Sequence, residues 1–243
     1  MKKSLFVSLV ALFASFNVIC DSLMGFPELS SGVWQGWIFI AAPITGIVLG
    51  PYAGFLSTLI GVMIGHSIYF RDVYEFLFTF GAPIGAMVSG FLFRGKWKAV
   101  LAYYTALLGI YFITPIAWQL PILGMWDVYL AYSILLVITM IIVQKGGPWN
   151  PKSKGLPYVL ALSALIGLEA DILFRIIVFV PGQTYRLFYD LDVEKLTPMW
   201  LGAAVVTPVK VALSILVTVT VGPALIRTIR KIRFLKEDDT SSC

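Results

Sequence analysis

Eight apolar stretches, separated by short polar segments, occupy most of the 243-residue chain. A helix needs about 20 residues to cross ~30 Å of hydrocarbon, and it satisfies its own backbone hydrogen bonds where no water is present. The pattern therefore predicts an all-α, polytopic membrane bundle with about eight hydrophobic segments and roughly six to eight spans. The predicted stretches are Leu5 to Leu23, Trp37 to Leu49, Tyr52 to Phe70, Tyr74 to Phe93, Ala99 to Ala117, Val128 to Val143, Leu156 to Val180 and Met199 to Ile226.

The composition agrees with a membrane environment. Hydrophobic residues make up 59% of the chain and charged residues only 13%, whereas about a quarter of a soluble domain is charged. No polar stretch is long enough for a separate soluble domain. We therefore expect a single integral membrane domain over residues 1–235, in the cell membrane, followed by a polar cytoplasmic tail over residues 236–243.

The position of the basic residues predicts the topology, because short cytoplasmic loops collect Lys and Arg. Gly50-Pro51 is either a turn between two helices or a kink within one. With a turn, both termini lie in the cytoplasm, and most of the 18 basic residues lie on that side, leaving Arg71, Arg186 and Lys195 outside. A kink gives a less asymmetric distribution, so the turn is favoured. Pro51 also suits the first turn of a new helix.

Several classes of function are excluded by missing motifs. His66 is the single histidine, so a multi-histidine zinc site cannot form, and neither H-E-x-x-H nor G-x-S-x-G occurs. No Walker A sequence is present, so any dependence on ATP has to come from another chain. We expect neither catalytic activity nor a cofactor. The net charge of +5 arises in the inner loops and indicates contact with the lipid bilayer and not with nucleic acid.

Charged residues within the predicted spans are the first candidates for a site, because a charge in the bilayer is costly unless it is paired or wetted. Glu169, Asp171 and Arg175 lie in the seventh stretch and Lys210 in the eighth. Asp171 and Arg175 are four residues apart and can pair on one helical face, while Glu169 points elsewhere. Either these charges form a structural lock between the last two helices, or they line a pocket for a charged or zwitterionic solute.

The predicted outer face supplies a second set of candidates. Asn17 and Asp21 end the first stretch, and Trp126 and Asp127 flank an outer loop. Aromatic residues at this depth commonly form an interfacial belt, but polar groups among aromatics on several loops also suit the mouth of a binding pocket. A further outer cluster at helix ends is predicted from His66, Arg71, Asp72 and Glu75.

Small residues recur four apart along several stretches, a spacing that lets membrane helices approach closely. We expect these ridges to pack within the monomer, with a partner subunit or motion during transport as the alternatives. The ridges are Gly46, Gly50 and Gly54; Gly61 and Gly65; Gly81, Gly85 and Ser89; and Ala82, Ala86 and Gly90.

Three segments resemble the substrate-binding S component of energy-coupling factor (ECF) transporters. They are Ala11 to Asn17, Gly46 to Phe55, and Gly81 to Gly85 with the following Phe93 to Lys96; the final Thr207 to Lys210 and its basic end also fit. The resemblance is better in the first hundred residues and the last helix than in the middle. The family usually has six spans, so no substrate contact is transferred from it.

The resemblance implies a membrane-embedded subunit that captures a vitamin or similar micronutrient outside and releases it inside. It implies partners in the same complex, namely a transmembrane coupling subunit and a pair of ATPases. The family's A-x-x-x-A motif, which contacts the coupling subunit, corresponds to Ala11 and Ser15, with Ser in place of the second Ala. The alternatives are a non-transporting scaffold or regulatory subunit, and a solitary secondary transporter that uses Glu169 or Asp171 as a proton site.

Overall fold

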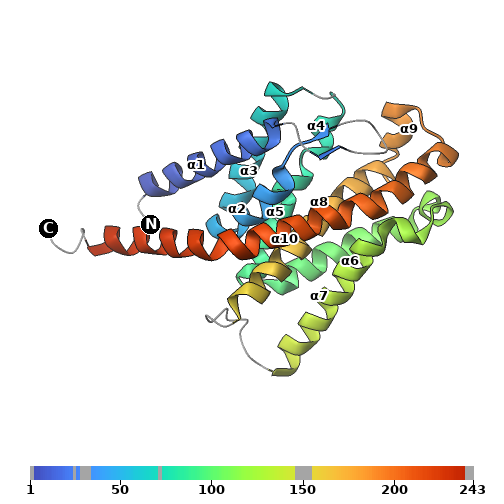
Figure 1. Cartoon of the computed structure of the whole chain (residues 1–243). Helices are drawn as coiled ribbons and strands as arrows, with labels where there is room; N and C mark the ends of the chain where they lie inside the picture. Colours follow the sequence, from blue (N-terminus) through green and yellow to red (C-terminus); the bar gives the residue numbers. More distant parts are fainter. Residues whose placement is uncertain (1–2, 24–25, 28–33, 71–72, 146–154, 239–243) are drawn as a thin grey trace.

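The computed structural model describes residues 3–23, 26–27, 34–70, 73–145 and 155–238, and this part of the chain is almost entirely helical (Figure 1). A single pair of two-residue strands, antiparallel to each other, precedes the second helix in the described residues. The elements are α1 (Lys3–Ser22), β1 (Phe26–Pro27), β2 (Trp34–Gln35), α2 (Ile38–Leu49), α3 (Pro51–Ile68), α4 (Glu75–Phe78), α5 (Gly81–Phe93), α6 (Trp97–Ile113), η1 (Pro115–Gln119), η2 (Ile122–Met125), α7 (Trp126–Lys145), α8 (Leu156–Phe179), α9 (Thr184–Tyr189) and α10 (Val193–Asp238).

Five helical segments of the described chain are long and apolar enough to cross a membrane. They are Ser4–Ser22, Pro51–Ile68, Glu75–Phe93, Ile122–Gln144 and Val193–Ile229. Two shorter apolar helices accompany them, Ile38–Leu49 and Trp97–Ile113. Large apolar side chains are exposed on the outer faces, such as Leu12 at 64%, Met140 at 60% and Leu216 at 60%. Such surfaces suit contact with lipid, so the all-helical prediction is confirmed and the fold is consistent with membrane association.

The helices of the first hundred residues pack through small residues, as the ridges predicted. A side-chain carbon added at Gly54 would lie 2.6 Å from the Gly46 Cα, and one added at Gly46 would overlap the backbone of Ala86. These positions join α2 to α3 and α2 to α5. Because lipid gives no hydrophobic drive for helix association, such close backbone contact and the resulting dispersion energy stabilise the bundle.

Gly50-Pro51 is a turn between two helices. Gly50 has φ +104° and ψ 169°, a backbone conformation that is essentially restricted to glycine, and α3 begins at Pro51. The Arg94 guanidinium donates to the carbonyl oxygens of Gly46, Ile47 and Gly90 at 3.3–3.4 Å. It therefore satisfies carbonyls at the end of α2, where the helix cannot do so itself.

Helix α8 lies in the middle of the molecule. It crosses α5 at a point where both helices have small residues. A side-chain carbon at Gly85 would lie 2.8 Å from the Gly167 carbonyl oxygen, and one at Gly167 would overlap Ser89. The 24-residue α8 carries Glu169, Asp171 and Arg175, so this crossing brings charged side chains into the interior of the bundle.

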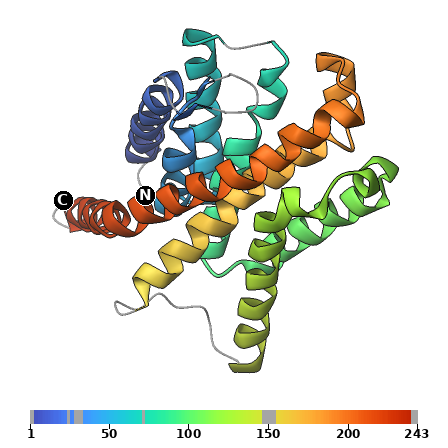
Figure 2. The same cartoon turned by 45° about the vertical axis from the view of Figure 1, so that its right-hand side comes forward.

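The α6–α7 hairpin covers the other side of α8 and α10, away from α1–α3 (Figure 2). Its core is aromatic: Tyr104 is fully buried and donates to the Ile166 carbonyl at 2.7 Å, and Tyr103 donates to the Ala170 carbonyl at 2.8 Å. These two hydrogen bonds satisfy buried hydroxyls and fix the distance of α6 from α8.

The ends of three predicted stretches differ from the structure. The fourth is divided by a turn at Thr79 and Phe80 between α4 and α5. The fifth ends at Ile113, because Thr114 is extended before Pro115. The eighth is much longer, since α10 continues through three prolines to Asp238. The predicted polar tail is thus helical at its start, and residues 239–243 lie outside the described residues.

Candidate functional site

A cavity of about 600 Å³ lies towards one end of the helix bundle, between α1–α5 on one side and α7–α10 on the other. It is lined by the last turns of α1 and α3, by α4, by the first turns of α2, α5 and α7, and by the second half of α8 and the first half of α10. Single residues of η2 and α9 complete the lining. Figure 1 shows α4 and α9 at this end, and the first turn of α1 and last turns of α10 at the other. The charged lining side chains are Asp21, His66, Glu75, Asp127, Asp171, Arg175 and Lys210.

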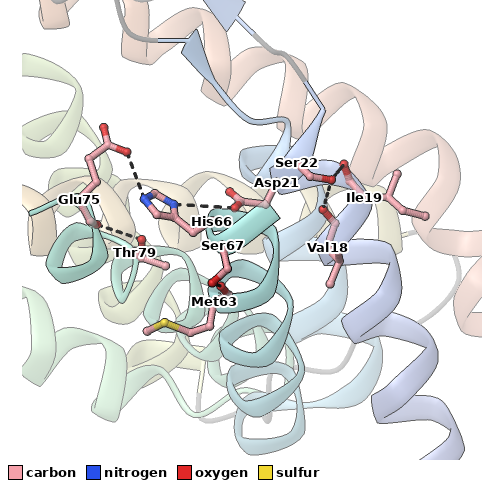
Figure 3. Close-up of polar contacts among 9 residues, drawn as sticks. All are labelled: Val18, Ile19, Asp21, Ser22, Met63, His66, Ser67, Glu75 and Thr79. Carbon is pink, nitrogen blue, oxygen red and sulfur yellow. Dashed lines mark hydrogen bonds and ion pairs between the residues drawn. The ribbon is translucent and has the colours of Figure 1, made fainter. Parts of the chain in front are cut away.

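His66 lies between two carboxylates at the wall of this cavity (Figure 3). Its Nδ1 is 4.0 Å from Asp21 Oδ2, and its Nε2 is 3.6 Å from Glu75 Oε2. The imidazole is only 2% exposed and its ring meets Phe76 edge-on at 4.7 Å. Neutral imidazole has one donor nitrogen and one acceptor nitrogen, so only the imidazolium form offers a donor to both carboxylates. The cluster joins α1, α3 and α4.

Asp171 and Arg175 form the ion pair that their spacing on α8 predicted. Arg175 Nε donates to Asp171 Oδ1 over 2.6 Å, with the carboxylate buried and the guanidinium about one-third exposed. A side-chain carbon at Gly81 would overlap the Asp171 carboxylate. Gly81, at the start of α5, therefore leaves room for the Asp171 carboxylate and its ion pair.

Asp127 and Trp200 form another part of the wall. Thr207 on α10 donates its hydroxyl to Asp127 Oδ2, and the backbone N–H of Val128 donates to Oδ1 at 2.9 Å. No ion pair joins Asp127 to a basic side chain in the described ranges. The Trp200 indole N–H donates to the Pro121 carbonyl at 3.0 Å, and its ring lies parallel to Tyr111 with centroids 6.3 Å apart.

Glu169 faces a different space from Asp171, as its position on α8 predicted. It lines a smaller hollow of about 140 Å³ together with Trp126 and Asp127. Glu169 is 2% exposed, and its Oε2 has no hydrogen-bond partner among the described residues. Trp126 donates its indole N–H to the Ala204 carbonyl at 2.9 Å. Asp127 lines both spaces and so separates the small hollow from the large cavity.

The structure thus brings five of the eight predicted substrate-contacting residues to the large cavity: Asp21, Asp127, Asp171, Arg175 and Lys210. Glu169 and Trp126 line the hollow beside it. Asn17 lines neither, because its amide donates to the Phe13 carbonyl at 2.8 Å and to Thr45 Oγ1 at 3.2 Å, within the contact of α1 with α2.

The polar residues that line the cavity and that sequence reasoning did not predict as binding candidates include His66, Glu75 and Thr207. His66 and Glu75 were predicted to form a helix-end cluster, and their contact is present, but nothing local shows that it faces a cavity. Thr207 contacts Asp127 across 80 residues of sequence. The other members of the predicted cluster, Arg71 and Asp72, lie outside the described residues.

The segment just before α10 forms part of the rim of the cavity and is held in place by a hydrogen bond. Asp192 follows the lining residue Leu191, and its carboxylate accepts a hydrogen bond from the Lys195 backbone N–H at 2.8 Å. This bond lowers the pKa of the exposed Asp192 carboxyl, and the nearby Lys195 ammonium acts in the same direction. Asp192 is therefore an N-terminal cap of α10.

The cavity combines acidic, basic and aromatic side chains. No group of three or more His, Cys, Asp or Glu in the described part of the chain could hold a metal ion. The cavity offers charges of both signs beside aromatic rings in the interior of a helical bundle, which is typical of a site for a small polar molecule.

On the outer side of α1, Ala11 and Ser15 are both exposed one turn apart. The Ser15 hydroxyl donates to the Ala11 carbonyl at 3.1 Å, so the hydroxyl is satisfied within the helix. Both positions carry small side chains on the surface of α1.

No protein-family model matches this sequence, and neither a curated protein nor a solved structure matches the chain.

Proposed function

We propose that this chain is a membrane-embedded substrate-binding subunit for uptake of a vitamin or similar micronutrient, of the kind found in ECF transporters. The observation that carries the proposal is the 600 Å³ cavity lined by seven ionisable side chains. Burial of so many ionisable groups is costly unless they pair or bind a ligand. Two ion-paired groups in the cavity, Asp171 and Arg175, come from the predicted site.

The direction of the cavity supports uptake from outside. The segments rich in Lys and Arg follow α5, lie at and after the end of α7, and form the last turns of α10, whereas the cavity lies towards the opposite ends of these helices. By the positive-inside rule, the basic end faces the cytoplasm. The cavity then opens towards the outer surface, in the cell membrane, where a scarce nutrient is captured.

The outer face of α1 supports a coupling partner. Ala11 and Ser15 are exposed and small, while the opposite face of α1 packs on α3 through Asn17 and Gly61. A transmembrane coupling subunit that binds this face, together with a pair of ATPases, would supply the energy that the chain cannot obtain for itself.

A first experiment is affinity purification of the tagged chain from gently solubilised native membranes. Mass spectrometry of the co-purifying proteins and of the small molecules released on denaturation identifies partners and solute. We expect a second membrane subunit, an ATPase pair and a bound micronutrient. A folded preparation with no partner and no bound solute would contradict the proposal.

Substitutions on α1 test the partner surface. Ala11→Trp or Ser15→Trp should abolish uptake and co-purification of the ATPases, because the bulky ring prevents close approach of a helix. Solute binding by the purified chain should persist, since neither side chain lines the cavity. Leu216→Trp, on the exposed face of α10, is the matched control and should preserve uptake. Uptake that survives both α1 substitutions would contradict the assigned surface.

A solitary proton-coupled transporter is the second candidate, and Glu169 favours it. This buried carboxyl group lies beside the hollow that Asp127 separates from the main cavity, as expected of a proton site. Uptake into liposomes that contain this chain alone, driven by a proton gradient and lost in Glu169→Gln, would establish the second candidate over the first.

A further inference from the structure

We infer that the small hollow beside the main cavity binds a proton, which is held by Glu169 and whose affinity depends on the charge of Asp127. The hollow has a volume of about 140 Å³, and both carboxyl groups line it. The inference goes beyond the proposed function, because it holds for the binding subunit whether an ATPase pair or a proton gradient powers uptake. The second candidate function requires in addition that the proton crosses the membrane with the solute.

Glu169 lies in surroundings that do not compensate a negative charge. Its side chain is 2% exposed, and its Oε2 has no hydrogen-bond partner among the described residues. The hollow is otherwise lined by Trp126, by Asp127 and by apolar side chains, without a basic side chain from the described ranges. An ionised carboxylate buried in this way is costly, so the group takes up a proton and becomes neutral. The proton belongs on Oε2, the oxygen without a partner.

The helices around α8 bring one other ionisable side chain of the described residues to the lining of the hollow, that of Asp127 on α7. α2 and α5 contain no ionisable residue within their bounds. From α6, the hydroxyls of Tyr103 and Tyr104 donate to carbonyls of α8. Lys210 of α10 and Asp171 of α8 line the main cavity and not the hollow. The state of Glu169 therefore depends on burial and on Asp127.

Hydrogen bonds favour the ionised form of Asp127. Its Oδ1 accepts from the Val128 backbone N–H at 2.9 Å, and its Oδ2 accepts from the Thr207 hydroxyl. Donors to both oxygens stabilise a carboxylate. Two ionised carboxylates in one largely apolar hollow repel each other, so the charge of Asp127 helps to keep the proton on Glu169. Because Asp127 also lines the main cavity, the proton site adjoins the site proposed for the solute.

The hollow lies beside a proline of α10. Pro208 lines it and has no N–H to donate to the carbonyl of Ala204, four residues earlier. The Trp126 indole N–H donates to that carbonyl at 2.9 Å, and this bond joins α7 to α10 at the wall of the hollow. The volume of about 140 Å³ exceeds the ~10–15 Å³ that one water molecule requires. Water in this space provides a path by which Glu169 exchanges its proton.

Infrared spectroscopy of the purified full-length chain in lipid nanodiscs detects the proton directly, because a carboxylic acid has a C=O stretching band that a carboxylate lacks. At neutral pH we expect such a band. It should shift when glutamate is labelled with a heavy isotope at its carboxyl carbon, and it should be absent in Glu169→Gln. Glu194→Gln, the same substitution at an exposed position of α10, is the matched control and should retain the band. The absence of an acid band, a band that glutamate labelling does not shift, or one that survives in Glu169→Gln would overturn the inference.

Asp127→Asn shows whether the neighbouring charge contributes to proton binding. Asparagine keeps the shape, and its amide oxygen can accept from Thr207. As the pH is raised, the Glu169 acid band should disappear at a pH lower by roughly one unit than in the unchanged chain, because the repulsion between the two carboxylates is removed. Asp192→Asn, on the exposed rim, is the matched control and should leave this pH unchanged. The same pH in Asp127→Asn and in the unchanged chain would overturn the role of Asp127.

The proton site and the proposed function fail separately. Co-purifying ATPases and a bound micronutrient, in a chain without the Glu169 acid band, would refute only the proton site. The band in a folded preparation with neither partner nor solute would refute only the proposed uptake function.

Discussion

At the scale of single residues, the Asp171–Arg175 ion pair lines the cavity, with its carboxylate buried. We expect Arg175→Ala to lower the free energy of unfolding by about 1–3 kcal/mol, because it leaves the Asp171 carboxylate in the interior without its charged donor. Affinity for the solute should fall as well. Chemical denaturation in detergent micelles measures the first effect, and calorimetric titration measures the second.

A double variant separates the loss of the pair from the loss of a side chain. Asp171→Asn with Arg175→Gln removes both charges, so it should recover part of the stability lost in Arg175→Ala. The exposed pair Asp192–Lys195, with its charged atoms 3.6 Å apart, serves as the control, and Lys195→Ala should have no measurable effect. Equal stability of the single and double variants would show that the buried charge is tolerated.

At the scale of helices, the close contact of α2 with α5 depends on the absence of a side chain at Gly46. We expect Gly46→Ala to destabilise the bundle by about 1–3 kcal/mol, since the added carbon overlaps the Ala86 backbone and the helices have to separate. The cavity should be affected, because α2 and α5 both contribute to its lining. Thermal unfolding in detergent checks the first point.

Gly109 on α6 is the matched control, because nothing lies within 4 Å of a side-chain carbon added there. Gly109→Ala should stabilise the protein by about 0.5–1 kcal/mol, through the greater helix propensity of alanine. If both substitutions stabilised the protein equally, the close contact of α2 with α5 would be refuted.

At the scale of the whole molecule, local spacing predicts the helices and the Asp171–Arg175 pair, because both depend on neighbours within a few residues. The turn at Gly50-Pro51 follows from residue type and the distribution of charge. The rest depends on packing between distant segments. Thr207 reaches Asp127 only because α7 and α10 meet, and Asn17 turns to Thr45 only because α2 packs on α1. The eighth predicted stretch, Met199 to Ile226, is shorter than α10 because apolar composition marks only the middle of this helix, which continues to Asp238 through a charged end.

The orientation of the whole chain determines which side of the membrane supplies the solute. In a variant with Cys20 and Cys243 changed to serine, we expect Leu187→Cys, which is 71% exposed on α9 near the cavity, to react with a membrane-impermeant maleimide in intact cells. Lys98→Cys, exposed at the basic end of α6, should react only after permeabilisation, because Lys-rich loops remain in the cytoplasm. The opposite labelling pattern would place the cavity on the cytoplasmic side, and the chain could then not capture a nutrient from outside.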